Sequence, residues 1–491
     1  MAGSCRHGIV SAVGPTFATL EVSTLTTAAR QGLPDWAAPG SPSPIRLLHR
    51  RPHPLNHRRF AIKINALLDV NVLAHETTDE VTVLLELEAP AVDTDAARPP
   101  STLQVVLDRS GSMDGAPLEG AKAALISLVQ RLEPADNFGL VTFDNEAQVV
   151  VQAGPLTDNA QVIAQIHAIA TGGCTDLGAG YLRGLRELRR VATPGAGGTV
   201  LVISDGHINA GITGIDDFAS ITAKAYADRI VTSTLGYGRG YDESLLSAIA
   251  RSGSGNHVFA DNPDAAGAAI AQEIDGLLDK VVQVATLTVA FEPTVQMLRL
   301  YNDLPAQQIA DGTVMIELGD LYSAETRKLL MRLQVPAMAA LGLAQVATLT
   351  LEYIELPGLV EQSVSLPITV NVVPGDEVGD RIPHPSVQSE VLFQEAQESK
   401  RKASEAFEAG DVDGGETFLA CAHSLIGSAL NVAPPDLAQG MRDESDEIDA
   451  LRSLTSVEDA GFLSKSTRDS YHHQNRKRGR RRTGGDQDGA R

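Results

Sequence analysis

The feature that most constrains this chain is an alternation of apolar strands and amphipathic helices between residues 101 and 283. Residues 103–107 read LQVVL and residues 199–203 read TVLVI, and both are continuous apolar runs of strand length. Such strands are buried on both faces, so the pattern predicts an α/β fold with a doubly wound, mainly parallel sheet that helices cover. We expect the last helix of this region to run over residues 261–282.

Three short polar motifs interrupt the alternation. D-R-S-G-S at residues 108–112 and S-D-G at residues 204–206 each follow an apolar strand directly, and G-G-C-T-D at residues 172–176 lies between two helices. Ligands of open α/β sheets bind beyond the carboxyl ends of the strands. Two of the motifs therefore lie at that edge, and we expect the third to loop over it.

The side chains of these motifs offer oxygen atoms as donors. They are two carboxylates and three hydroxyls, from Asp108, Ser110, Ser112, Thr175 and Asp205. Hard oxygen ligands select Mg²⁺, with Mn²⁺ and Ca²⁺ as alternatives, over zinc. Two carboxylates only balance a divalent charge, so the ion would still attract an outside anion. The alternative reading of D-x-S-x-S by itself is a turn followed by a helix cap, because Asp and Ser favour both.

The three motifs resemble the metal-ion-dependent adhesion site of the von Willebrand factor type A (VWA) domain, which residues 101–283 resemble as a whole. The resemblance implies that Ser110, Ser112 and Thr175 coordinate the ion directly or nearly so. Asp108 and Asp205 would act directly or through water. All five positions match the family pattern. The strands on either side resemble those of bacterial relatives that set this domain on a β-rich neighbour.

Other segments flank this unit. We expect an irregular basic segment at the amino end, strands that join a β-sandwich on either side of the α/β region, a helical region with a hairpin, and a disordered basic tail that contains RKRGRRR. The expected bounds are residues 1–64, 65–100, 284–375, 386–462 and 463–491.

Composition excludes several classes of function. The chain has 40 Lys and Arg against 62 Asp and Glu, a net charge of −22, so the folded core is not expected to bind nucleic acid or anionic membranes. Its three cysteines are far apart and form no C-x-x-C pair, which favours a reducing compartment and a cytoplasmic location. No apolar run is long enough to span a membrane.

Signatures of catalysis are also missing from the sequence. It contains neither a phosphate-binding G-x-x-x-x-G-K-[ST] motif nor G-x-S-x-G around a serine. His207 lies beside the third motif and is the one candidate general base, but a histidine in an exposed loop is the simpler interpretation. We therefore expect no enzymatic activity.

Two functions remain, and a third is weaker. The first is a metal-dependent protein–protein interaction in which Mg²⁺ at the five residues captures an Asp or Glu carboxylate of a partner. The second is a substrate adaptor or accessory subunit of an AAA+ ATPase of the MoxR or chelatase type. The third is an enzyme that uses the metal as a Lewis acid.

Overall fold

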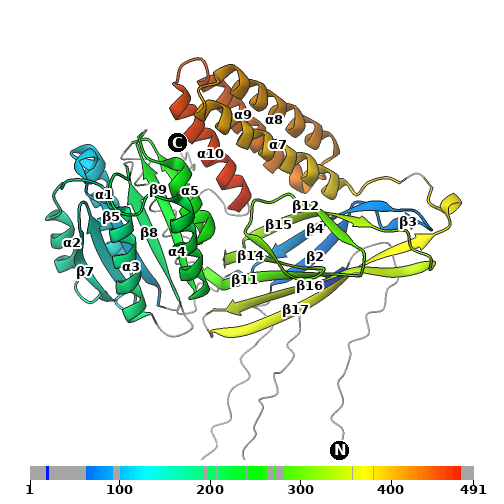
Figure 1. Ribbon diagram of the computed structural model, residues 1–491, viewed down its shortest axis with the longest axis horizontal. Helices are drawn as coiled ribbons and strands as arrows, with labels where there is room; N and C mark the ends of the chain where they lie inside the picture. Colours follow the sequence, from blue (N-terminus) through cyan, green and yellow to red (C-terminus); the bar gives the residue numbers. More distant parts are fainter. Residues whose placement is uncertain are drawn as a thin grey trace, which may run out of the picture.

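A computed structural model describes most of the chain and arranges it as an α/β unit, a two-sheet β unit and a helical bundle (Figure 1). No helix among the described residues has the length and apolar character needed to cross a membrane. The described residues are 18–20, 62–91, 100–192, 197–205, 208–238, 240–262, 267, 270, 280–356, 358–379 and 381–476.

The α/β unit is built on a six-stranded sheet in the order β10-β9-β8-β5-β6-β7. Five of its strands are parallel and β7 is antiparallel to β6, so the predicted mainly parallel sheet is confirmed. The strands are β5 (Thr102–Asp108), β6 (Asn137–Phe143), β7 (Ala147–Pro155), β8 (Gly198–Ser204), β9 (Ile230–Tyr237) and β10 (Ser254–Ala260).

Helices cover both faces of this sheet. Alternate residues of β5 show why: Val105 packs in a core with α1 and α2, while Val106 packs in a second core with α3, α4 and α5. Both residues are fully buried, as predicted for a strand that is apolar on every side. The helices are α1 (Ala116–Arg131), α2 (Asn159–His167), α3 (Leu177–Val191), α4 (Ile215–Ala227) and α5 (Glu243–Ser252).

Two sheets enclose a single apolar core in the β unit, with the strand orders β1-β2-β4-β15-β12 and β13-β14-β11-β16-β17-β3. Their strands are β1 (Ala18–Leu20), β2 (Lys63–Leu68), β3 (Val72–Ala74), β4 (Asp79–Glu88), β11 (Lys280–Phe291), β12 (Gln296–Leu300), β13 (Ala306–Ala310), β14 (Thr313–Tyr322), β15 (Thr326–Val335), β16 (Gly342–Glu355) and β17 (Val360–Val373).

The structure corrects the expected start of this unit and the end of the preceding helix. Ala18–Leu20, in the segment predicted to be irregular, is a strand that pairs with β2; residues 1–17 and 21–61 lie outside the described part. The predicted helix over residues 261–282 ends before Lys280, where β11 begins. Gly267 and Ile270 are helical. Residues 280–291 instead alternate buried and less buried side chains between β14 and β16, which is a strand pattern.

The helical bundle follows a short 3₁₀ turn at Gly375–Glu377 and consists of α7 (Pro385–Glu408), α8 (Val412–Val432), α9 (Pro435–Leu454) and α10 (Ala460–Arg476). Helix α10 corrects the prediction of disorder from residue 463 onward. Leu463, Thr467 and Tyr471 recur every four residues and are buried, so a mostly polar sequence still forms one packed helical face. Residues 477–491 lie outside the described part.

Candidate metal centre

The first motif forms a tight turn at the carboxyl end of β5. Asp108 is the last residue of the strand, and its side chain is buried. The backbone N–H of Ser110 donates to Asp108 Oδ1 at 2.8 Å, and Ser204 Oγ donates to Asp108 Oδ2 at 2.6 Å. The turn after β5 and the neighbouring strand β8 thus each fix one oxygen of this carboxylate.

A chain of hydroxyls joins this turn to the end of β8. Ser110 Oγ lies 3.1 Å from Ser112 Oγ, and Ser112 Oγ donates to Asp205 Oδ1 at 2.8 Å. Ser112 and Asp205 are 93 positions apart in the sequence. The parallel pairing of β5 with β8 brings the two strand ends to one edge of the sheet, as predicted.

The second motif lies over the same turn. The backbone N–H of Gly111 donates to the Gly173 carbonyl at 3.0 Å, and that of Gly172 donates to the Arg109 carbonyl at 2.6 Å. Thr175 follows directly and is buried, and its N–H donates to Asn209 Oδ1 at 2.8 Å. The structure therefore gathers the loops that carry all five predicted residues at one edge.

The loop after β6 supports the second motif, a role that the sequence motifs did not predict. Asp144 pairs with Arg109 at 2.9 Å and accepts the Asp176 N–H at its carbonyl. Asn145 Oδ1 accepts the Cys174 N–H. Asp144 and Asn145 directly follow the run FGLVTF at residues 138–143, just as the first and third motifs follow apolar strands, and that position was the signal available in the sequence.

The electrostatics of the site suit a cation. Burial raises the pKa of Asp108, and burial together with the charge of Asp108 raises that of Asp205 to about 6. The hydrogen bonds to both carboxylates come from hydroxyls and a backbone amide. Two converging acids that are costly to charge fit a divalent ion, which would favour their ionised forms.

The donor types fit a hard ion. Within the described residues, no three His, Cys, Asp or Glu side chains form a metal cluster, and three of the five donors here are hydroxyls. This chemistry favours Mg²⁺ or its relatives over zinc. His207 and Gly206 lie outside the described residues, so the candidate general base has no structural account.

Comparison with known proteins gives a consistent result for this unit. Residues 103–272 match the family model of the von Willebrand factor type A domain. Among solved structures, a von Willebrand factor type A protein from Catenulispora acidiphila aligns with a TM-score of 0.63 at 17% identity, over 79% of this chain and 91% of that one. The ArnB paralog VWA2 from Sulfolobus acidocaldarius gives 0.57 at 14% identity, over 83% and 98%. Both likenesses concern the fold.

Curated relatives share about a quarter of their aligned residues. The chain is 26% identical to the uncharacterised protein sll0103 of Synechocystis over 57% of its own length and 69% of that protein. It is also 26% identical to the uncharacterised protein YfbK of Escherichia coli, over 45% and 39%. The pig inter-alpha-trypsin inhibitor heavy chain H1 is 26% identical to this chain. The aligned region covers 36% of this chain and 20% of that protein.

Proposed function

We propose, from the von Willebrand factor type A domain that residues 103–272 match, that this chain is a metal-dependent protein-binding protein and not an enzyme. The site at Asp108, Ser110, Ser112, Thr175 and Asp205 would be an intact metal-ion-dependent adhesion site. The observation that carries the proposal is the hydrogen-bonded chain from Ser110 through Ser112 to Asp205, beside a buried Asp108.

The five residues would contribute two kinds of ligand to an ion, charged carboxylates and neutral hydroxyls. Asp108 supplies a fixed negative charge because Ser204 and the Ser110 N–H hold its two oxygens. Asp205 supplies the second charge from a less buried position. The hydroxyls of Ser110, Ser112 and Thr175 add neutral oxygens. A bound Mg²⁺, or Mn²⁺ or Ca²⁺ in its place, would supply an open coordination position for a carboxylate.

The partner that fits this arrangement is a protein that presents an Asp or Glu side chain. With two carboxylates around a divalent ion, the site is electrically balanced and accepts one further anion without a net repulsion. A subunit of a MoxR-like or chelatase-like AAA+ ATPase is the second candidate partner. A cytoplasmic location, suggested by the sparse cysteines, belongs to the same proposal.

Affinity capture from extract of the source cells, in Mg²⁺ and in EDTA, tests this function. We expect a partner that wild-type protein retains in Mg²⁺ and loses in EDTA. Asp108→Asn keeps the size of the side chain but removes one charge, so it should lose the same partner in Mg²⁺. Asp228→Asn is the matched control, because Asp228 lies at the opposite edge of the sheet and pairs with Arg189. Equal retention by Asp108→Asn would contradict the proposal.

A further inference from the structure

Helix α10 of the bundle lies against the α/β unit, at the edge strand β10 (Figure 1). Asp469 Oδ1 accepts the backbone N–H of Phe259 at 2.9 Å, so a side chain of α10 takes the place of a neighbouring strand. The rings of Phe259 and Phe462 meet edge to face, with centroids 6.0 Å apart. The helix therefore covers an edge of the sheet that otherwise offers a free hydrogen-bonding strand.

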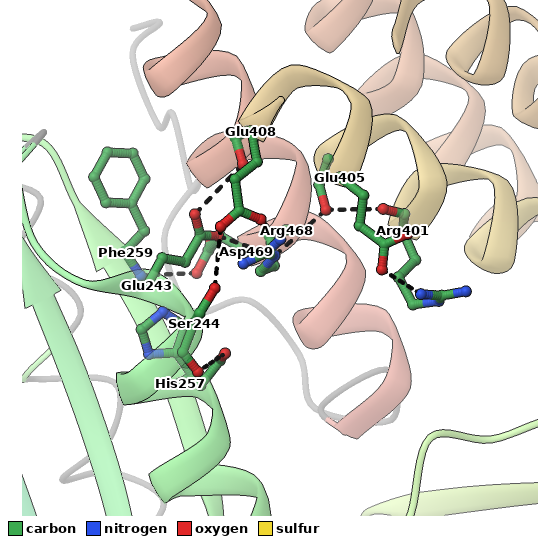
Figure 2. Close-up of polar contacts among 12 residues, drawn as sticks. Glu243, Ser244, His257, Phe259, Arg401, Glu405, Glu408, Arg468 and Asp469 are labelled. Carbon is green, nitrogen blue, oxygen red and sulfur yellow. Dashed lines mark hydrogen bonds and ion pairs between the residues drawn. The ribbon is translucent and has the colours of Figure 1, made fainter. Parts of the chain in front are cut away.

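One arginine of α10 joins both neighbouring helices. Arg468 pairs with Glu243, the first residue of α5, at 3.3 Å and with Glu408, at the end of α7, at 2.6 Å (Figure 2). Ser244 Oγ also donates to Glu408 at 3.0 Å. Arg468 and Glu243 expose 12% and 5% of their side chains, so loss of the arginine would leave a buried carboxylate without its cation.

A series of contacts through Tyr241 connects α10 with the metal centre. Lys465 Nζ of α10 lies 4.7 Å from the centre of the buried Tyr241 ring. The ring packs against Gly236 of β9 so closely that a Cβ atom at Gly236 would overlap it. Gly236 is the register partner of Ser204, the residue that holds Asp108.

The same segment also lies near the residue that carries the other carboxylate. A Cβ atom built on Gly240, next to Tyr241, would be 3.9 Å from the main-chain carbonyl oxygen of Asp205. The segment from Gly240 to Glu243 thus contacts α10 on one side and lies close to the Asp205 backbone on the other.

We propose that α10 is a positioning element for the metal centre, with Arg468 and Lys465 holding the segment 240–243 against β9 and close to the Asp205 backbone. The inference rests on the proposed function. When α10 is docked, the two carboxylates are held in place before an ion arrives, so binding costs less ordering of the chain. By thermodynamic reciprocity, an ion at the site must stabilise the docking of α10 by the same factor.

Titration of the full-length protein with Mn²⁺, followed by electron paramagnetic resonance, measures the affinity, and hydrogen exchange measures the docking of α10. We expect Arg468→Gln to weaken Mn²⁺ binding by roughly fivefold and to speed the exchange of α10 amides. Arg468→Lys should restore most of the affinity, because a lysine can still pair with Glu243 and Glu408. Mn²⁺ should slow α10 exchange in the wild-type protein.

Arg401→Gln is the control, because Arg401 pairs with Glu398 and Glu405 of its own helix α7 (Figure 2). It should leave Mn²⁺ affinity at the wild-type value even if it lowers the melting temperature. If Arg468→Gln fails to fold, Lys465→Gln should also weaken Mn²⁺ binding and speed the exchange of α10 amides, by a smaller factor. Wild-type affinity in the folded variant would overturn the positioning role alone. A wild-type protein that binds no Mn²⁺ would overturn the proposed function as well.

Discussion

Asp205 links the protonation of the candidate metal centre to the stability of the fold. Burial and the nearby Asp108 raise its pKa to about 6 from the ordinary value of 3.8, so the folded protein holds this proton more tightly than the unfolded chain does. The protonated Asp205 therefore contributes stability that is present in full below the pKa of Asp205 in the unfolded chain. This contribution is lost as the pH rises through about 6, the pKa in the folded protein.

Asp205→Asn should therefore stabilise the metal-free protein at neutral pH. The gain is on the order of 1 kcal/mol, because solvent screens a group that is only partly buried. Thermal unfolding in EDTA between pH 4 and 7 measures it. The melting temperature of the variant should exceed that of wild type at pH 7, and the two should converge near pH 4. A constant difference across the range would show that the charge of Asp205 is not the cause.

Gly172 leaves no room for a side chain. A Cβ atom at this position would overlap Asp144 Oδ2, and Asp144 pairs with Arg109 of the first motif. Gly172→Ala should cost about 1–3 kcal/mol of unfolding free energy, as overpacking does elsewhere, and should weaken Mn²⁺ binding. Urea denaturation measures the cost. Gly154→Ala, where a Cβ meets open space, is the control and should change the free energy far less.

The five candidate ligands could be read from the sequence because their spacing and their place after strands are local features. Ser204 was inside a recognised motif, but its bond to Asp108 depends on the pairing of β5 with β8. Asp144 has the same difficulty, since its role arises where the loop after β6 meets the second motif. Hydrogen bonds of this kind depend on how segments distant in sequence are aligned with each other in the fold. The spacing of residues within one motif does not reveal that alignment.

Among the elements, apolar runs and helical spacing were enough for the strands of the parallel sheet and for the helical hairpin of α7 and α8. They failed at α10, whose buried positions include Ser464, Thr467 and Ser470. Small polar side chains of this kind lower the apparent hydrophobicity of a helix while still packing. The surfaces of α7 and β10 supply the rest of the burial, and they are distant in sequence.

Leu463→Ala tests whether α10 is part of the cooperative fold. Leu463 is 1% exposed and packs with Phe407 and Leu419, so the substitution should cost about 2–5 kcal/mol. The free energy of unfolding in urea is the measurement. Val457→Ala is the matched control, because Val457 is 74% exposed and its truncation should change little. An equal effect of both substitutions would mean that α10 does not contribute to the folded core.

For the whole molecule, the order of the α/β unit, the β-sandwich strands and the helices along the chain could be predicted from the pattern of apolar residues. The way the chain connects these units in space could not. The apolar character of residues 67–73 predicts one strand there, yet β2 and β3 are separate strands in different sheets. Asp69 lies at that break and accepts the N–H groups of Val70 and Thr82, which a pattern of apolar residues does not reveal. The same holds for α10, which returns from the bundle to the α/β unit.

Direct titration of the purified protein with Mn²⁺ tests the central claim, that five oxygen-bearing side chains form one metal site. We expect one ion per chain, competition by Mg²⁺ for the same site, and about tenfold weaker binding by Asp108→Asn. Asp228→Asn should bind as wild type does. If folded Asp108→Asn binds Mn²⁺ as tightly as wild type does, these five side chains do not form the metal site.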